Sequence, residues 1–95
     1  MIKVEINYKG KGFDSLHVKG HANTAEYGKD LVCAAVSAVV TGAFNAIKEV
    51  KDFKFVLEEG NAELISLKTI SAHDEIVIET LITQLRTIAE SSPKF

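Results

Sequence analysis

Hydrophobic and polar residues alternate at the start of the chain, as in a β-strand with one buried face. The apolar positions of this first strand are all even-numbered: Ile2, Val4, Ile6 and Tyr8. A turn is expected at Gly10–Gly12, because glycine adopts positive φ at little cost. Leu16 and Val18 then alternate with polar residues in a second strand that ends at Gly20 and His21. The pattern therefore predicts a β-hairpin.

A long apolar stretch rich in alanine and valine predicts a helix over residues 31–50, after a polar loop over residues 22–29. Asp30, directly before the helix, is a suitable N-cap. The polar stripe of this helix is narrow and consists of Ser37, Thr41, Asn45, Lys48 and Glu49. A helix this apolar has to be covered on more than one side. We expect the sheet on one side and a second helix or another subunit on the other.

The second half of the chain repeats the order strand, strand, helix. Residues 53–58 and 62–68 are expected to form strands joined by a turn at residues 59–61. A one-sided apolar stripe predicts a helix from about Asp74 to Ser91, with Ser71 or Asp74 as its cap. The order ββαββα predicts an α+β two-layer sandwich, with two helices on one face of a four-stranded, mainly antiparallel sheet. The 95 residues are enough for a single domain over residues 1–95.

Composition and charge exclude several classes of protein. A net charge of −2 argues against direct binding of nucleic acid, because no basic excess is present to neutralise phosphates. The longest apolar stretch, residues 31–44, is shorter than the ~20 residues of a membrane span, and the N-terminus does not resemble a signal peptide. We therefore expect a cytoplasmic protein. A single cysteine excludes an internal disulfide and a multi-cysteine zinc site, and we expect neither a metal nor a cofactor.

That cysteine, Cys33, is the main candidate for chemistry. With Asp30 as the cap, Cys33 is the third residue of the helix, where the positive end of the helix dipole favours a thiolate. If the preceding loop folds back, His21 reaches the thiol, and a thiol with an imidazole partner is the minimum for a cysteine nucleophile. The amides of Cys33 and Ala34 are candidates for an oxyanion hole.

Two neighbouring residues have candidate supporting roles. Asp30 either orients His21 or only caps the helix. Ser37, one helical turn after Cys33, is a candidate contact for substrate or for the sulfur, although a bond to the carbonyl one turn earlier is the commoner role of a helical serine.

The residues leave other interpretations open. Lone cysteines are usually buried, which favours an inert thiol in a non-catalytic, dimeric binding module. A redox sensor is a third interpretation, although the chain has no second cysteine to resolve a sulfenate. Strict strand alternation would also point His21 away from Cys33, unless Gly20 relaxes the register. His17 and His73 are interpreted as surface residues. Glu58, Glu59 and Glu63 either attract a basic substrate or form a solvated hairpin tip, which we favour.

Gly20-His21-Ala22, followed by Gly28-x-Asp30-x-Val32-Cys33-Ala34-Ala35-Val36-Ser37, resembles the motif of the ribosomal-processing cysteine proteases. The resemblance covers nearly the whole chain. It implies a small α+β homodimer, formed through the first helix, in the bacterial cytoplasm. It also implies an endopeptidase that removes the N-terminal extension of a ribosomal protein precursor, the twenty-seventh protein of the large subunit. By position, Cys33 would be the nucleophile, His21 the general base and acid, and Asp30 the supporting acidic residue, with Gly20 in the substrate-contacting motif.

Overall fold

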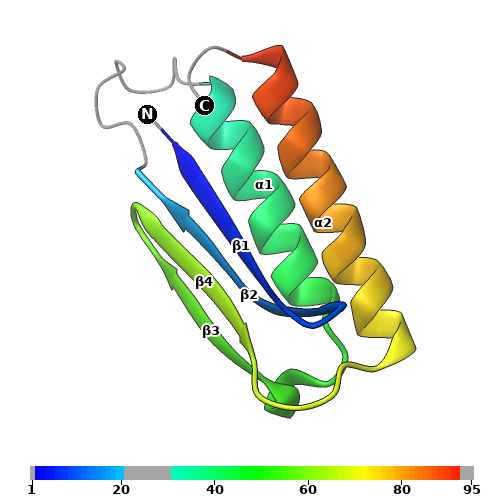
Figure 1. The fold of residues 1–95 in the computed structure, drawn as a ribbon. Coiled ribbons are helices and arrows are strands. Elements are labelled where there is room, and N and C mark those ends of the chain that lie inside the picture. Colours follow the sequence, from blue (N-terminus) through cyan, green and yellow to red (C-terminus); the bar gives the residue numbers. More distant parts are fainter. Residues whose placement is uncertain (1, 21–30, 93–95) are drawn as a thin grey trace.

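A computed structural model describes residues 2–20 and 31–92. Four strands form one antiparallel sheet in the order β1-β2-β4-β3. The two helices lie side by side across one face of this sheet (Figure 1). The expected α+β sandwich is confirmed. The elements are β1 (Lys3–Lys9), β2 (Gly12–Lys19), α1 (Leu31–Ala46), the short 3₁₀ helix η1 (Val50–Asp52), β3 (Phe53–Glu58), β4 (Asn61–Ser66) and α2 (Ala72–Ser91).

The register of the sheet places its apolar residues under the helices. Leu16 of β2 is paired with Ile6 on one side and Leu64 on the other, and both leucines are buried. Tyr8 was expected to continue the buried face of β1, and this prediction is wrong, since Tyr8 is 54% exposed. The register shifts between Asn7 and Tyr8, because Asp14 is an extra residue of β2 without a partner in β1. Such a bulge breaks the alternation of buried and exposed positions.

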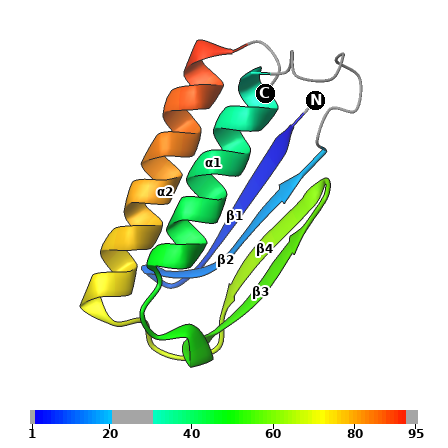
Figure 2. The ribbon, with the colours of Figure 1, turned by 180° about the vertical axis from the view of Figure 1, so that it is seen from behind.

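Helix α1 is covered on two sides, as its apolar character required. Val36, Val40 and Phe44 are buried against the sheet, and α2 lies alongside α1 in both views (Figures 1 and 2). A third side of α1 remains exposed, and its first residue, Leu31, is 77% exposed. The other exposed positions of the first three turns carry small residues: Ala34, Ala38, Thr41 and Gly42.

The end of α1 is fixed by a buried carboxylate of α2. Asp74 Oδ1 accepts the backbone N–H of Lys48 at 2.9 Å, and Asp74 Oδ2 accepts that of Glu49 at 3.0 Å. These two amides therefore bond to Asp74 instead of continuing the helical ladder. The predicted helix end at residue 50 is wrong for this reason, and α1 ends at Ala46. Asp74 does not cap α2; Ser71 does, because its Oγ accepts the N–H of Asp74 at 3.3 Å.

We expect Asp74→Ala to lower the free energy of unfolding by about 3 kcal/mol, because two backbone N–H groups lose their buried acceptor. The adjacent Glu75 is exposed, and Glu75→Ala is the matched control, with a loss below about 1 kcal/mol. Urea denaturation followed by circular dichroism measures both changes. Equal losses in the two variants would contradict the anchoring role of Asp74.

The same contact gives stability a defined pH dependence. Burial raises the pKa of Asp74, but the hydrogen bonds from Lys48, Glu49 and Ser71 and the charge of His73 outweigh it and hold this pKa below the ordinary 3.8. The stabilisation by Asp74 is therefore present above pH 3.8 and is lost as the pH falls through the lower pKa of the folded state. The stability difference between the native protein and Asp74→Ala should shrink over that acidic range and stay constant from pH 5 to 8.

Candidate active site

Cys33 lies in the first turn of α1, as its sequence position predicted. The helix begins at Leu31, so Cys33 is its third residue. The residue is half-buried, and its side chain packs against the edge of the hydrophobic core. It forms no disulfide. The thiol is thus held on a packed helix while part of the residue is exposed, which differs from the fully buried position expected of an inert structural cysteine.

Gly20 ends the alternation of β2. The strand stops at Lys19, and Gly20 adopts a φ of +88°, in the left-handed region that glycine enters most readily. Its N–H donates to the carbonyl oxygen of Gly60 in the β3–β4 turn at 3.2 Å. The strand register therefore does not continue past Gly20. The predicted base His21, the acid Asp30 and the loop over residues 22–29 lie outside the described residues, and their roles stay predictions.

Three segments meet at one end of the molecule. Figure 1 shows the end of β2, the β3–β4 turn and the start of α1 at the same end of the sandwich. The bond between Gly20 and Gly60 ties two of these segments together. Because α1 starts at this end, Cys33 lies in the part of the fold where the chain leaves β2 at Gly20.

Of the other predicted site residues, Ala34 is exposed and Ser37 is half-buried. Ser37 lines a pocket of about 260 Å³ between α1 and the β3–β4 hairpin. The hairpin contributes Leu57, Glu58 and Glu59, which were not predicted as site residues. The sequence signal for Leu57 is weak, because apolar residues at three successive positions of β3 left the buried face of the strand undefined.

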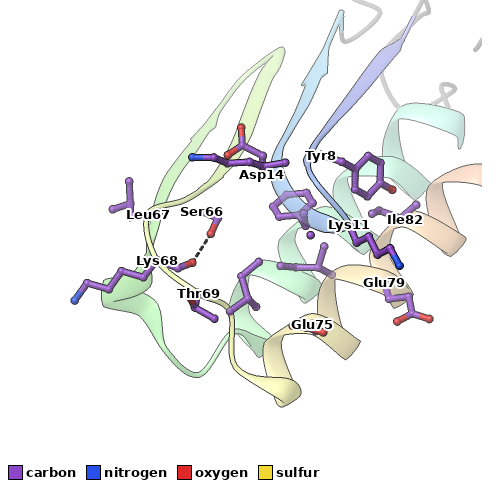
Figure 3. A pocket seen from close by; sticks show the side chains of 15 residues that line it. Tyr8, Lys11, Asp14, Ser66, Leu67, Lys68, Thr69, Glu75, Glu79 and Ile82 are labelled. Atoms are coloured by element: carbon purple, nitrogen blue, oxygen red, sulfur yellow. Dashed lines mark hydrogen bonds between the residues drawn. The ribbon is translucent and has the colours of Figure 1, made fainter.

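A larger pocket of about 720 Å³ lies at the other end of the molecule, between the β1–β2 turn, the β4–α2 connection and the first half of α2. Figure 3 shows its side chains, with the hydroxyl of Ser66 donating to the carbonyl oxygen of Lys68 at 2.7 Å. Lysines and carboxylates both line it, so it has no clear charge preference. None of the predicted site residues lines this pocket, and we do not assign the candidate chemistry to it.

The two described histidines have structural contacts. His17 is on the open face of the sheet, where its Nε2 lies 2.6 Å from Asn61 Oδ1 and 3.5 Å from Glu63 Oε1. It is only partly exposed, so its interpretation as a surface residue holds in part. His73 Nε2 lies 3.1 Å from the carbonyl oxygen of Ala46, at the end of α1. Within residues 2–20 and 31–92, no three His, Cys, Asp or Glu residues form a group that could hold a metal ion. No helix in these ranges is long and apolar enough to cross a membrane.

Comparison with protein families decides the class of this chain. The model of the family described as cysteine protease Prp matches residues 1–95. The chain belongs to this family of cysteine proteases. One curated relative, the ribosomal processing cysteine protease Prp of Staphylococcus aureus (strain Mu50), is 33% identical over 93 residues, which span 94% of this chain and 87% of the relative.

Solved structures agree with the family in sequence and in shape. The ribosomal processing protease Prp of S. aureus with a covalently linked product peptide is similar to this chain, with a TM-score of 0.83 and 31% identity over 96% of this chain and 91% of that one. The same S. aureus protease with a substrate peptide gives a TM-score of 0.79 and 30% identity over 95% and 90% of the two chains. The family of cysteine proteases implied by the sequence motif is thereby confirmed.

We expect Gly20→Ala to lower the free energy of unfolding by about 1–2 kcal/mol, because a side chain at positive φ is strained. Gly20→Asn should lose less, since asparagine tolerates this conformation better. The control is Gly42→Ala in the middle of α1, where an added Cβ meets nothing within 4 Å. It should raise stability by about 0.5–1 kcal/mol. Chemical denaturation compares the three variants, and a Gly20→Ala variant as stable as the native protein would refute the constraint.

Proposed function

We propose that this protein is a cytoplasmic cysteine endopeptidase that removes the N-terminal extension of the twenty-seventh protein of the large ribosomal subunit during ribosome maturation. The observation that carries the proposal is the position of Cys33, partly exposed in the first turn of α1, in a chain that belongs to a cysteine protease family. Relatives named ribosomal processing proteases, one of them seen with a substrate peptide, support the class of substrate.

In the proposed reaction, His21 takes the proton of the Cys33 thiol. The thiolate attacks the carbonyl carbon of the scissile peptide bond and forms a carbon–sulfur bond, giving a tetrahedral oxyanion. The start of α1 favours the thiolate and the oxyanion, because the positive end of the helix dipole lies there. The first-turn amides, with that of exposed Ala34 foremost, are positioned to donate hydrogen bonds to the oxyanion.

The intermediate collapses when the His21 imidazolium gives its proton to the leaving amine and the carbon–nitrogen bond breaks. A thioester to Cys33 remains. His21 then takes a proton from water, the resulting hydroxide attacks the thioester, and the product acid and the thiol are released. Asp30 orients His21 or caps α1 in this scheme. Gly20 sets the direction in which the chain leaves β2 toward His21. No step needs a metal or a cofactor.

The proposed partners are a ribosomal protein precursor and a second copy of the chain. The net charge of −2 suits a basic protein substrate better than direct contact with nucleic acid. For the homodimer, we propose the side of α1 that neither the sheet nor α2 covers. Its exposed residues are apolar or small, which allows a second helix to approach closely: Leu31, Ala34, Ala38 and Gly42. A domain of 95 residues buries a modest fraction of its surface, so a second copy adds stability.

Cleavage of the precursor tests the proposed function. The native protein should make one cut near the N-terminus of the organism's own precursor, read by intact mass. Cys33→Ala and His21→Ala should each lower kcat/KM by about 10³-fold or more, because nucleophile and base act as one unit. Ser91→Ala, far along α2, is the control and should leave cleavage unchanged. Cutting that survives Cys33→Ala would refute the mechanism, whereas a native protein that cuts nothing would refute the function.

The dimer has a separate test. Ala38 is exposed in the middle of α1, and Ala38→Glu would bury a charge in the proposed interface. We expect the native protein to sediment with twice the mass of the 10.4 kDa chain, and Ala38→Glu to weaken association at least about tenfold. The control is Glu79→Ala on the exposed face of α2, which should sediment like the native protein. A native monomer at micromolar concentration would contradict this interface.

A further inference from the structure

The pocket beside Ser37 exists because α1 carries small residues where it faces the uncovered strand β3. Near the middle of the sheet the space between α1 and β3 is filled, since the rings of Phe44 and Phe55 pack edge to face with centroids 5.4 Å apart. Closer to the start of α1, the facing residues are Ser37 and Thr41, whose side chains are too short to reach across. A gap of about 260 Å³ is left.

This gap has an apolar floor. Leu57 of β3, Ala62 of β4 and Val18 of β2 stand in one row across the helix-facing side of the sheet. Val18 and Ala62 are buried, as are Val36 and Val40 of α1, which also line the gap. Leu57 is 54% exposed, because no helix covers β3, the strand farthest from the helices in both views (Figures 1 and 2). An apolar group that entered would complete the packing of Leu57.

The gap lies beside the proposed nucleophile. Cys33, Ser37 and Thr41 follow one another at intervals of four residues, so they form one stripe along α1, with steps of about 6 Å. An extended peptide advances by about 3.3 Å per residue. A chain attacked at Cys33 and running along this stripe therefore brings its second or third residue to the gap.

The rim of the gap is acidic. Glu58 and Glu59 line it, and both are exposed at the tip of the β3–β4 hairpin. No basic residue lines the gap. A peptide with an apolar side chain in the gap would pass these carboxylates, which favour lysine or arginine and disfavour aspartate or glutamate. Ribosomal proteins are rich in such basic residues, because they neutralise RNA phosphates.

We infer that this gap is a specificity pocket of the protease, and that it binds one bulky apolar side chain, two or three residues before the cut bond, in a peptide segment that carries basic residues. The inference rests on the proposed function, in which the acyl half of the substrate stays attached to Cys33 after the amine leaves. An anchor on that half keeps the chain aligned until water completes the reaction. Filling a preformed apolar pocket with one side chain gives the kind of localised contact that dominates peptide recognition.

Peptidyl chloromethyl ketones test the pocket without the ribosomal substrate. The thiolate of Cys33 displaces chloride and forms a stable thioether, which intact mass detects. Acetylated tripeptide ketones with alanine next to the ketone would carry phenylalanine, alanine or aspartate at the two preceding positions. We expect the phenylalanine compound to inactivate the native protein at least about tenfold faster than the alanine compound, and the aspartate compound to be slowest.

Variants of the pocket should remove this preference. Leu57→Ala removes one wall, and Thr41→Trp fills the mouth of the gap from an exposed helix position. Both should react with the phenylalanine and alanine compounds at similar rates. Leu67→Ala is the matched control, because Leu67 is 58% exposed but lies at the other pocket, and it should keep the native preference. Because Leu57→Ala is a mild change, it remains informative if Thr41→Trp does not fold.

The acidic rim has its own arm of the experiment. A lysine added before the phenylalanine pair should speed inactivation relative to glutamate, and the double variant Glu58→Gln, Glu59→Gln should abolish that difference. Added salt should weaken it as well.

Equal rates for the phenylalanine and alanine compounds in the native protein would overturn the inference, as would a preference that survives both pocket variants. A native protein that cuts the precursor but shows no preference refutes the pocket alone. A native protein that shows the preference but cuts no precursor refutes the ribosomal substrate alone. No inactivation by any of the ketones contradicts both.

Discussion

The packing of α1 on the sheet is the constraint on which the rest of the structure depends. Val36, Val40 and Phe44 are buried over Leu16 and Leu64, so the rotation of the helix about its axis is fixed. Asp74 fixes the other end of α1 through the amides of the residues that follow it. Once this rotation is set, Cys33 can only lie at the edge of the core, packed on one side and exposed on the other. The reactivity proposed for Cys33 thus follows from hydrophobic burial three and seven residues further along the helix.

The order of the elements and the sandwich were predictable from sequence, because the alternation in β1 and β2 and the apolar stripe of α2 are simple periodic patterns. Departures arose where one tertiary contact overrode such a pattern. The end of α1 depends on a carboxylate 26 residues away from Lys48, and the exposure of Tyr8 depends on a bulge opposite β1. Neither contact has a local signal in the sequence.

The candidate site divides in the same way. Cys33 and Gly20 were identifiable, since a lone cysteine at a helix start and a glycine at a strand end are local features. The gap beside Ser37 was not, because it results from the absence of large side chains on α1 opposite a strand that no helix covers. Family membership supports the reaction class, and the small residues of α1 give that class a specific place for substrate.

The central claim is that His21 and the start of α1 together make Cys33 a thiolate at neutral pH. The most direct test is the rate of Cys33 alkylation by iodoacetamide between pH 4 and 10, followed by intact mass for the native protein and for His21→Ala. The account predicts that the native rate reaches half its maximum well below the pH of about 8.5 typical of an ordinary cysteine, and that His21→Ala moves this midpoint upward. The same midpoint near pH 8.5 in both proteins would contradict the account.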